Sequence, residues 1–233
     1  MSNAQTFWLE NLKLADNYNN WIFAQILPHL GNSVMEVGCG NGNFTVLLAE
    51  HCDRAIAVDM DTSYVARAKS RLAHKPNVNV IQADITQTHW RSQFDSKFDS
   101  VVMLDVLEHI EDDVDLLRSL SDYLQPGGKL VVKVPALEWL YSPMDREIGH
   151  YRRYSKARLS ETFNSAGFAN PSIWYFNMAG IPGWWFNGKV LGRTTPGTEQ
   201  VGLFNKLVPM FQGVENVLPV PTGLSLYAVG TKM

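Results

Sequence analysis

Cysteine is scarce in this chain. Among its 233 residues only Cys39 and Cys52 are cysteines, and neither has the closely spaced Cys or His partners of a zinc motif. Two isolated cysteines argue against a disulfide framework, which small secreted domains use in place of a large core. We therefore expect a reducing, cytoplasmic compartment.

An excess of positive charge and long apolar runs are also missing. With 20 Lys and Arg against 23 Asp and Glu, the net charge is −3, which gives no electrostatic footprint for nucleic acid. No run approaches the 18 apolar residues of a membrane span, and residues 1–10 lack the pattern of a signal peptide. The 45% hydrophobic and 18% charged residues predict one globular domain over residues 1–233.

What the chain does have is a glycine loop, in the stretch VMEVGCGNGNFT from 34 to 45. Its apolar start predicts a short buried strand, and a helical pattern begins at Phe44. The loop glycines are Gly38, Gly40 and Gly42. Such a loop presents backbone N–H groups and a helix N-terminus to the polar end of a ligand. A dinucleotide fingerprint would need a third glycine at position 43, where the chain has Asn43.

Acidic residues follow the later predicted strands. The apolar run 54–59 ends in Asp59, which could accept both hydroxyls of a ribose or could instead cap the next helix. The strand predicted at 78–81 leads to Asp84 and Ile85, and the strand at 98–104 leads to Asp105. The carboxyl ends of parallel strands meet at one edge of a sheet, so we expect these acids to line one site.

The alternation of strands and helices predicts an α/β fold. Parallel strands with right-handed crossovers give a doubly wound, Rossmann-like sheet, whose core we expect within residues 31–170. Residues 1–30 predict a helical N-terminal segment, which could be a helix pair packed on the core, a lid over the cofactor, or both. Strands are predicted at 172–178 and 224–230. Between them, residues 180–222 predict an aromatic helical insertion that its glycines and prolines divide into two short helices.

The order of the glycine loop, Asp59, Asp84, Asp105 and the turn 126–128 (PGG) resembles class I S-adenosylmethionine (SAM) dependent methyltransferases. The likeness covers about residues 30–170, and the chain looks like bacterial small-molecule methyltransferases related to the ubiquinone-biosynthesis type. Residues 149–155 (GHYRRYS) extend the match. The resemblance implies SAM as cofactor and a seven-stranded, mostly parallel sheet with its last strand inserted antiparallel.

The resemblance also implies which residues contact the cofactor. The glycine loop would lie against the methionine part of SAM, Asp84 would accept from the adenine amino group, and Ile85 would lie against the ring. The full predicted set is Glu36, Gly38, Gly40, Gly42, Asp59, Met60, Asp84, Ile85 and Asp105.

Two histidines are candidates for a catalytic base. The methyl group of SAM is already activated, so the protein mainly positions the acceptor, and a base helps where the acceptor loses a proton. His109 follows the fourth strand and could titrate near neutral pH, which makes it the first candidate. His150 is the second. Either imidazole could instead have only a structural role.

Five further residues are predicted to contact the acceptor. Arg152 and Arg153 could bind a carboxylate or phosphate, or could form ion pairs with loop acids such as Asp145 or Glu147. Aromatic residues suggest a partly apolar or ring-bearing acceptor, although the aromatic insertion could equally fill its own core or form a homodimer interface. The predicted set is Tyr18, Tyr141, Arg152, Arg153 and Trp184.

A metal site is the last alternative. Asp105, Glu108 and His109 have the i, i+3, i+4 spacing that places three ligands on one helical face. Ubiquinone O-methyltransferases and small-RNA 2′-O-methyltransferases have E-x-x-E-H at this place for a divalent ion. Because this chain has Asp105 in place of the first Glu, and capping roles are an alternative, we predict no metal ligand.

Together these observations predict a methyltransferase that acts on O or N of a small, partly apolar or aromatic metabolite. A non-catalytic SAM-binding protein and an RNA methyltransferase remain alternatives, and the acidic balance counts against the second. Asn43 counts against a nicotinamide-dependent oxidoreductase. We expect a small-molecule acceptor as partner, with no nucleic acid and no membrane span, and leave a homodimer open.

Overall fold

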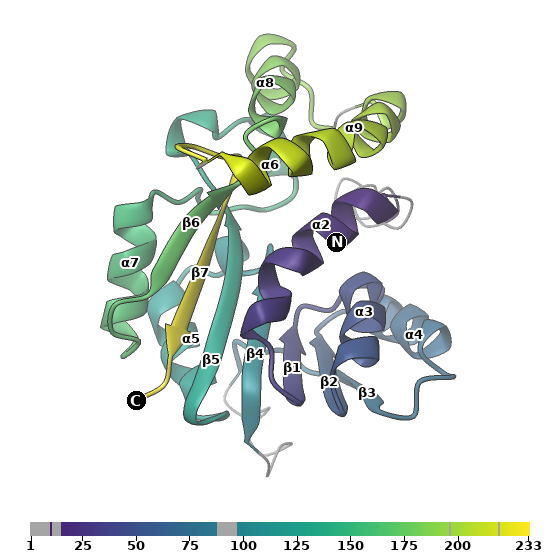
Figure 1. Ribbon diagram of the computed structural model, residues 1–233, viewed down its shortest axis with the longest axis vertical. Helices are drawn as coiled ribbons and strands as arrows, with labels where there is room; N and C mark the ends of the chain where they lie inside the picture. The colour runs from purple at the N-terminus through teal and green to yellow at the C-terminus, as the bar shows by residue number, and fades with distance from the viewer. Residues whose placement is uncertain (1–9, 11–14, 88–96, 196, 219) are drawn as a thin grey trace.

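The computed structural model describes residues 10, 15–87, 97–195, 197–218 and 220–233, and it contains a seven-stranded sheet (Figure 1). The strand order is β3-β2-β1-β4-β5-β7-β6. The strands are β1 (Ser33–Val37), β2 (Arg54–Asp59), β3 (Val78–Gln82), β4 (Phe98–Leu104), β5 (Leu124–Pro135), β6 (Ser172–Phe176) and β7 (Ser225–Thr231). The pairs among β1 to β5 are parallel, whereas β7 pairs antiparallel with both β5 and β6. The predicted mostly parallel sheet with an antiparallel last strand is confirmed.

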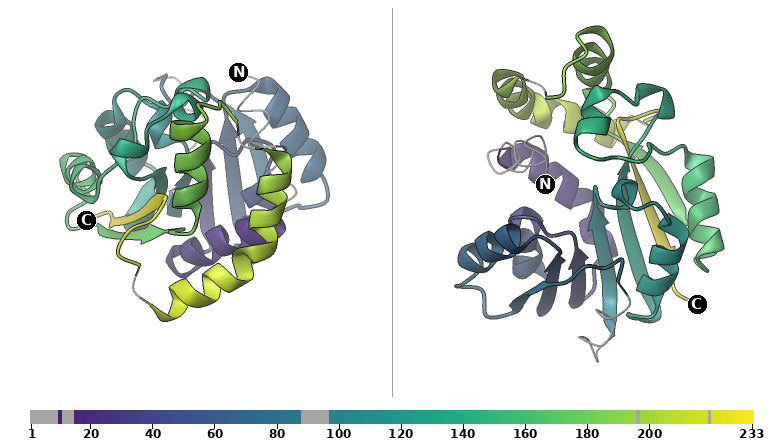
Figure 2. Two further views of the ribbon diagram at one scale, coloured as in Figure 1. Left: turned by 90° about the horizontal axis from the view of Figure 1, so that it is seen from above. Right: turned by 180° about the vertical axis from the view of Figure 1, so that it is seen from behind.

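Helices cover both faces of this sheet, so β1 is buried on both sides. Val34 packs in one core cluster with Trp21 of α2 and Val208 of α9, and Met35 packs in another with Leu117 of α5. The longer helices are α2 (Asp16–Ile26), α3 (Asn43–His51), α4 (Thr62–Arg71), α5 (Asp113–Ser121), α7 (Lys156–Ser165) and α9 (Thr198–Val217). Shorter turns are η1 (Leu27–His29), η3 (Leu107–His109), η4 (Glu138–Leu140), α6 (Pro143–Glu147) and α8 (Gly180–Trp185). Figure 2 shows this layering from two further sides.

The insertion before β7 differs from the prediction. It holds α8, which continues through a π-helical turn at Phe186–Val190, and then α9, which has 20 residues instead of being short. Helix α9 runs through Pro209, which cannot donate to the carbonyl of Asn205 one turn earlier. That carbonyl instead accepts from the Asn17 side chain at 3.1 Å, so an α2 residue satisfies the group that the proline frees.

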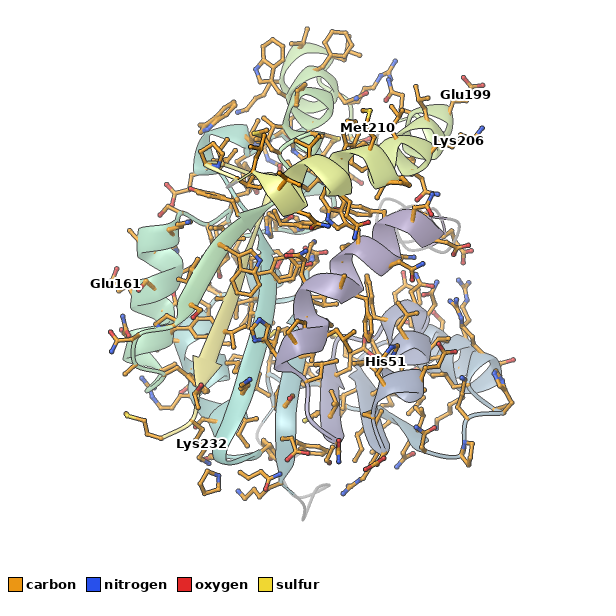
Figure 3. The ribbon with its side chains drawn as sticks, in the orientation of Figure 1. His51, Glu161, Glu199, Lys206, Met210 and Lys232 are labelled. Atoms are coloured by element: carbon orange, nitrogen blue, oxygen red, sulfur yellow. The ribbon has the colours of Figure 1, made fainter. Side chains whose placement is uncertain are left out.

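The same insertion forms an arm above the carboxyl ends of the parallel strands (Figure 1). Figure 3 marks Glu199, Lys206 and Met210 along α9. The arm is held to the N-terminal segment, where the Tyr18 N–H donates to the Asn205 side chain at 3.0 Å. Among the described residues, no helix combines the length and apolar character needed to cross a bilayer.

The N-terminal lid is described only in part. Residues 1–9 and 11–14 of the predicted 1–30 lid lie outside the described residues, and α2 accounts for its second helical segment. The lid role and the division into a 31–170 core and a 180–222 insertion remain predictions.

Candidate functional site

The glycine loop joins β1 to α3 as predicted. Gly38, Gly40 and Gly42 have φ values of 75°, 53° and 81°, a region that side-chain-bearing residues rarely adopt. The N–H groups of Gly38 and Cys39 donate to the Val58 carbonyl at 2.8 and 3.0 Å, which fixes the loop to the end of β2. Position 38 needs glycine for a second reason, because a Cβ there would lie 2.3 Å from the Val106 side chain.

Asp59 ends β2 beside this loop. Its Oδ2 accepts from the Gly40 N–H at 2.8 Å and its Oδ1 accepts from the Asp61 N–H at 2.9 Å. Burial raises the pKa of Asp59, and these two backbone donors oppose the shift. Asp61, not Asp59, is the N-cap of α4, since its side chain accepts from the Ser63 and Tyr64 N–H groups. The capping alternative for Asp59 is therefore wrong, and its ribose role stays a prediction.

Glu36 lies beneath the loop, with only 3% of its surface exposed. The Thr45 hydroxyl of α3 donates to Glu36 Oε2 at 2.5 Å, so this side chain ties β1 to α3. Burial raises the pKa of Glu36 to about 8, and the neighbouring Asp59 carboxylate adds to the rise. The structure gives Glu36 a supporting position, and its contact with the cofactor stays a prediction.

The remaining predicted cofactor residues continue along the same edge. Asp84 follows β3 and accepts from the Thr86 N–H at 2.9 Å, and Ile85 is partly buried against the core. Met60 is 63% exposed beside Asp59. The structure thus brings the predicted cofactor residues to the carboxyl ends of β1, β2 and β3, as expected for a doubly wound sheet.

Asp105 follows β4 in a strained conformation, with a φ of 55° that is uncommon outside glycine. Its two carboxylate oxygens lie 2.7 and 2.6 Å from Nζ of Lys133, a lysine of β5 that is only 3% exposed. Burial alone would lower the pKa of Lys133, but Asp105 and then Tyr18 raise it above the usual value. Asp105 is itself 42% exposed, so a compensated carboxylate faces outward at this edge.

Glu108 and His109 lie in the 3₁₀ turn η3, not on an α-helix with Asp105. The expected three-ligand helical face is therefore wrong, because the left-handed Asp105 and the tighter turn break the α-helical spacing. Instead His150, far along the chain, meets Glu108 and His109, and one ligand atom of each lies within 4.8 Å of the others. Three side chains that could serve as cation ligands thus lie together among the described residues, although they are not the set the sequence suggested.

The titration of His109 also differs from expectation. Burial, followed by the neighbouring His150, lowers the pKa of His109 to about 4. An imidazole with this pKa is uncharged at neutral pH and is a weak base there, which contradicts the expected titration near neutral pH. Burial, and then Asp105, raises the pKa of Glu108 well above its usual value.

The two arginines are engaged within the protein. The Arg152 guanidinium donates to Asp113 at 3.1 Å and to the Ile110 carbonyl at 2.9 Å. Arg153 is 2% exposed, donates to Asp145 at 2.8 Å and lies 4.5 Å from the centre of the Trp184 ring. These contacts match the alternative in which both arginines form ion pairs, with Asp113 as a partner in place of Glu147. They count against binding of an acceptor anion by the two arginines, and that role stays a prediction.

The predicted aromatic residues fall into two groups. The Tyr141 hydroxyl donates to the His150 carbonyl at 2.7 Å, which places it in the loop that carries the histidine. Tyr18 packs against Phe176 and Phe204 and accepts a hydrogen bond from Asn177 at 3.3 Å. Contact of either tyrosine with an acceptor remains a prediction.

Two important residues were missed from the sequence. Lys133 could have been noticed, because a lysine within the apolar run 130–135 is expensive to bury without a partner. Asp145 was considered only as an arginine partner, yet its Oδ1 also lies 3.0 Å from His150 Nδ1. Only the folded loop reveals that contact.

Comparisons with known proteins agree with this architecture. The methyltransferase domain family matches residues 35–132. A probable S-adenosylmethionine-dependent methyltransferase of Mycolicibacterium smegmatis is 29% identical over 154 residues, 65% of this chain and 58% of that protein. The trans-aconitate 2-methyltransferase of Deinococcus radiodurans is 29% identical over 133 residues, 53% of this chain and 49% of that protein. The alignments therefore span only about half of these relatives.

A solved structure supports the fold over nearly the whole chain. The N-methyltransferase NodS of Bradyrhizobium japonicum, in complex with S-adenosylhomocysteine, superposes with a TM-score of 0.55 at 16% identity, covering 93% of this chain and 86% of that one. The solved structure shows the likeness of the fold, and the family match, the relatives and the glycine loop make this chain similar to the class I, SAM-dependent methyltransferases.

Proposed function

We propose that this protein transfers a methyl group from SAM to a hydroxyl oxygen or an amine nitrogen of a small, partly apolar or aromatic acceptor, releasing S-adenosylhomocysteine. The observation that carries the proposal is the contact between the glycine loop and the segment after β4. Val106 packs so closely on Gly38 that a Cβ at position 38 would lie 2.3 Å from it. This contact supports a position for the Asp105 carboxylate beside the part of the loop expected to bind the methionine end of SAM.

The chemistry favours an acceptor group, such as a hydroxyl or an amine, that carries a proton it can release. In the transfer, a lone pair of the acceptor attacks the methyl carbon while the carbon–sulfur bond breaks and its electron pair stays on sulfur. A hydroxyl or a neutral amine gains positive charge as the methyl arrives and releases a proton to a nearby base or to water, whereas a protonated amine must lose a proton before it can attack. The outward carboxylate of Asp105 can accept a hydrogen bond from such a group, whereas it would repel an acceptor that is itself a carboxylate.

Aromatic side chains near this edge support a ring-bearing acceptor. Tyr18 of α2 packs with aromatic neighbours of β6 and α9, and Trp184 of α8 lies over Arg153. Both belong to segments that flank the carboxyl ends of the strands (Figure 1). Aromatic walls favour flat or apolar ligand groups by burying their surface and stacking on their rings.

The test is the rate of S-adenosylhomocysteine formation with a matched acceptor panel. Phenols, anilines and benzoates that share one ring system differ mainly in the group that receives the methyl. We expect turnover with hydroxyl or amino compounds and none above background with the benzoates. Turnover confined to the carboxylates would contradict the proposed acceptor class.

A further inference from the structure

Glu108 is a buried acid whose carboxylate is unused by the protein. It is fully buried, and among the described residues neither carboxylate oxygen has a hydrogen-bond partner. Its backbone is well held, because the Glu108 carbonyl accepts from the Tyr151 N–H at 2.8 Å. A buried carboxyl without donors is costly, so an orphaned group of this kind indicates a missing ion or ligand.

Two imidazoles lie next to this carboxylate, and each has one ring nitrogen within hydrogen-bond distance of another oxygen. His109 Nδ1 lies 3.2 Å from the Gly149 carbonyl, and a carbonyl oxygen can only accept, so Nδ1 carries the hydrogen. His150 Nδ1 lies 3.0 Å from Asp145 Oδ1, whose charge Arg153 compensates at 2.8 Å. Nε2 is the second ring nitrogen of each imidazole, and His150 Nε2 lies 3.6 Å from Glu108 Oε1.

The hydrogen-bond partners of these two histidines are those expected around the ligands of a metal site. Histidine ligands typically donate their second ring nitrogen to a carbonyl or carboxylate, which fixes the ring and its tautomer. Here Gly149 and Asp145 supply those two acceptors. The three ligand atoms lie within 4.8 Å of one another, and ligands at about 2.0–2.2 Å from one ion would need only a small inward movement.

Asp105 is not available to this cluster. Both of its oxygens are held by Lys133 Nζ, at 2.7 and 2.6 Å, and the turn that follows it is 3₁₀. A cation that drew Asp105 inward would leave the fully buried lysine without its main counter-charge, which is a large penalty. In the E-x-x-E-H enzymes the first Glu is a metal ligand. In this chain the residue at that position is Asp105, and it pairs with Lys133 instead.

We propose that Glu108, His109 and His150 bind a divalent transition-metal cation, with His150 as third ligand, while Lys133 keeps Asp105 out of the site. Two imidazoles and one carboxylate suit Zn²⁺, Co²⁺, Mn²⁺ or Fe²⁺ better than Mg²⁺ or Ca²⁺, which prefer oxygen. Three protein ligands leave positions open for an acceptor oxygen or nitrogen. The inference concerns binding, and it holds whichever acceptor the enzyme uses.

The experiment is a titration of the chelator-stripped protein with Co²⁺, followed by calorimetry and by the visible absorption of bound Co²⁺. We expect one cation per chain. Glu108→Gln and His150→Asn should weaken binding at least tenfold, since changes even to outer partners of metal ligands cost 10–100-fold. His150→Glu supplies an oxygen ligand in place of nitrogen, so it should bind more tightly than His150→Asn with a shifted Co²⁺ spectrum.

Two control variants decide between the assignments. Asp105→Asn and His51→Asn should keep the Co²⁺ affinity within about threefold, because His51 lies on α3, outside the cluster (Figure 3). The melting temperature and the circular dichroism spectrum of each variant confirm that it is folded. Absence of Co²⁺ binding by the unmodified protein would overturn the proposal, and so would binding lost in Asp105→Asn but kept in His150→Asn.

Discussion

Replacing Asp59 by alanine should weaken S-adenosylhomocysteine binding by about 1.5–3 kcal/mol, which is roughly a 10- to 150-fold loss. The reasoning starts from its two carboxylate oxygens, which hold the Gly40 N–H at 2.8 Å and the Asp61 N–H at 2.9 Å. Each oxygen keeps further lone pairs with which to accept from a ribose hydroxyl. Alanine removes the predicted ribose contacts and also frees the glycine loop from β2.

Asparagine at position 59 separates these two effects. Its one carbonyl oxygen can still accept from one of the two backbone N–H groups, but its amide nitrogen cannot accept from the other. Asp59→Asn should therefore lose less affinity than Asp59→Ala. Calorimetric titration with S-adenosylhomocysteine gives the affinities, and thermal unfolding reports any damage to the loop.

Asp61→Asn is the matched control. Asp61 caps α4 through the Ser63 and Tyr64 N–H groups, so its replacement tests the loss of an acid without a predicted cofactor contact. We expect a stability loss of no more than about 1 kcal/mol and an unchanged affinity. Unchanged affinity in Asp59→Ala, or an equal loss in both variants, would refute the ribose assignment.

Three further predictions concern the residues around the site. Gly38→Ala should lower stability by more than about 1 kcal/mol and abolish tight S-adenosylhomocysteine binding, because φ is 75° and the new Cβ would lie 2.3 Å from Val106; an unchanged melting temperature would contradict this. Burial raises the pKa of Glu36 to about 8, so the folded state favours the neutral form of this side chain. The free energy of unfolding should therefore fall as the pH rises from 4.5 to about 8. Urea unfolding at pH 5 and pH 9 should show a smaller fall in Glu36→Gln than in the unmodified protein. Lys133→Met removes the cation that holds both Asp105 oxygens, so it should lower kcat more than it weakens S-adenosylhomocysteine binding; unchanged turnover would argue against a role for this pair.

The sheet could be predicted from sequence because its signals are local. Residues 34–37 and 54–59 read as buried strands, and the glycines between them have the positive φ values that only glycine adopts easily. Each acid placed after a strand then falls at one edge of a parallel sheet without further information.

The errors come from contacts between distant segments. The spacing of Asp105 and Glu108 fits an α-helix, but the pairing of Asp105 with Lys133 across β4 and β5 selects a different backbone. Helix α9 continues through Pro209 because α2 satisfies the carbonyl of Asn205. Neither interaction leaves a periodic pattern in the sequence.

The most direct test of the account is a calorimetric titration of the purified protein with S-adenosylhomocysteine, with NAD as the matched dinucleotide control. The glycine loop with Asn43 at its end, together with Asp59 and Asp84, predicts one-to-one binding of S-adenosylhomocysteine and none of NAD. Binding of NAD alone, or of neither compound, would contradict the assignment of the loop to SAM.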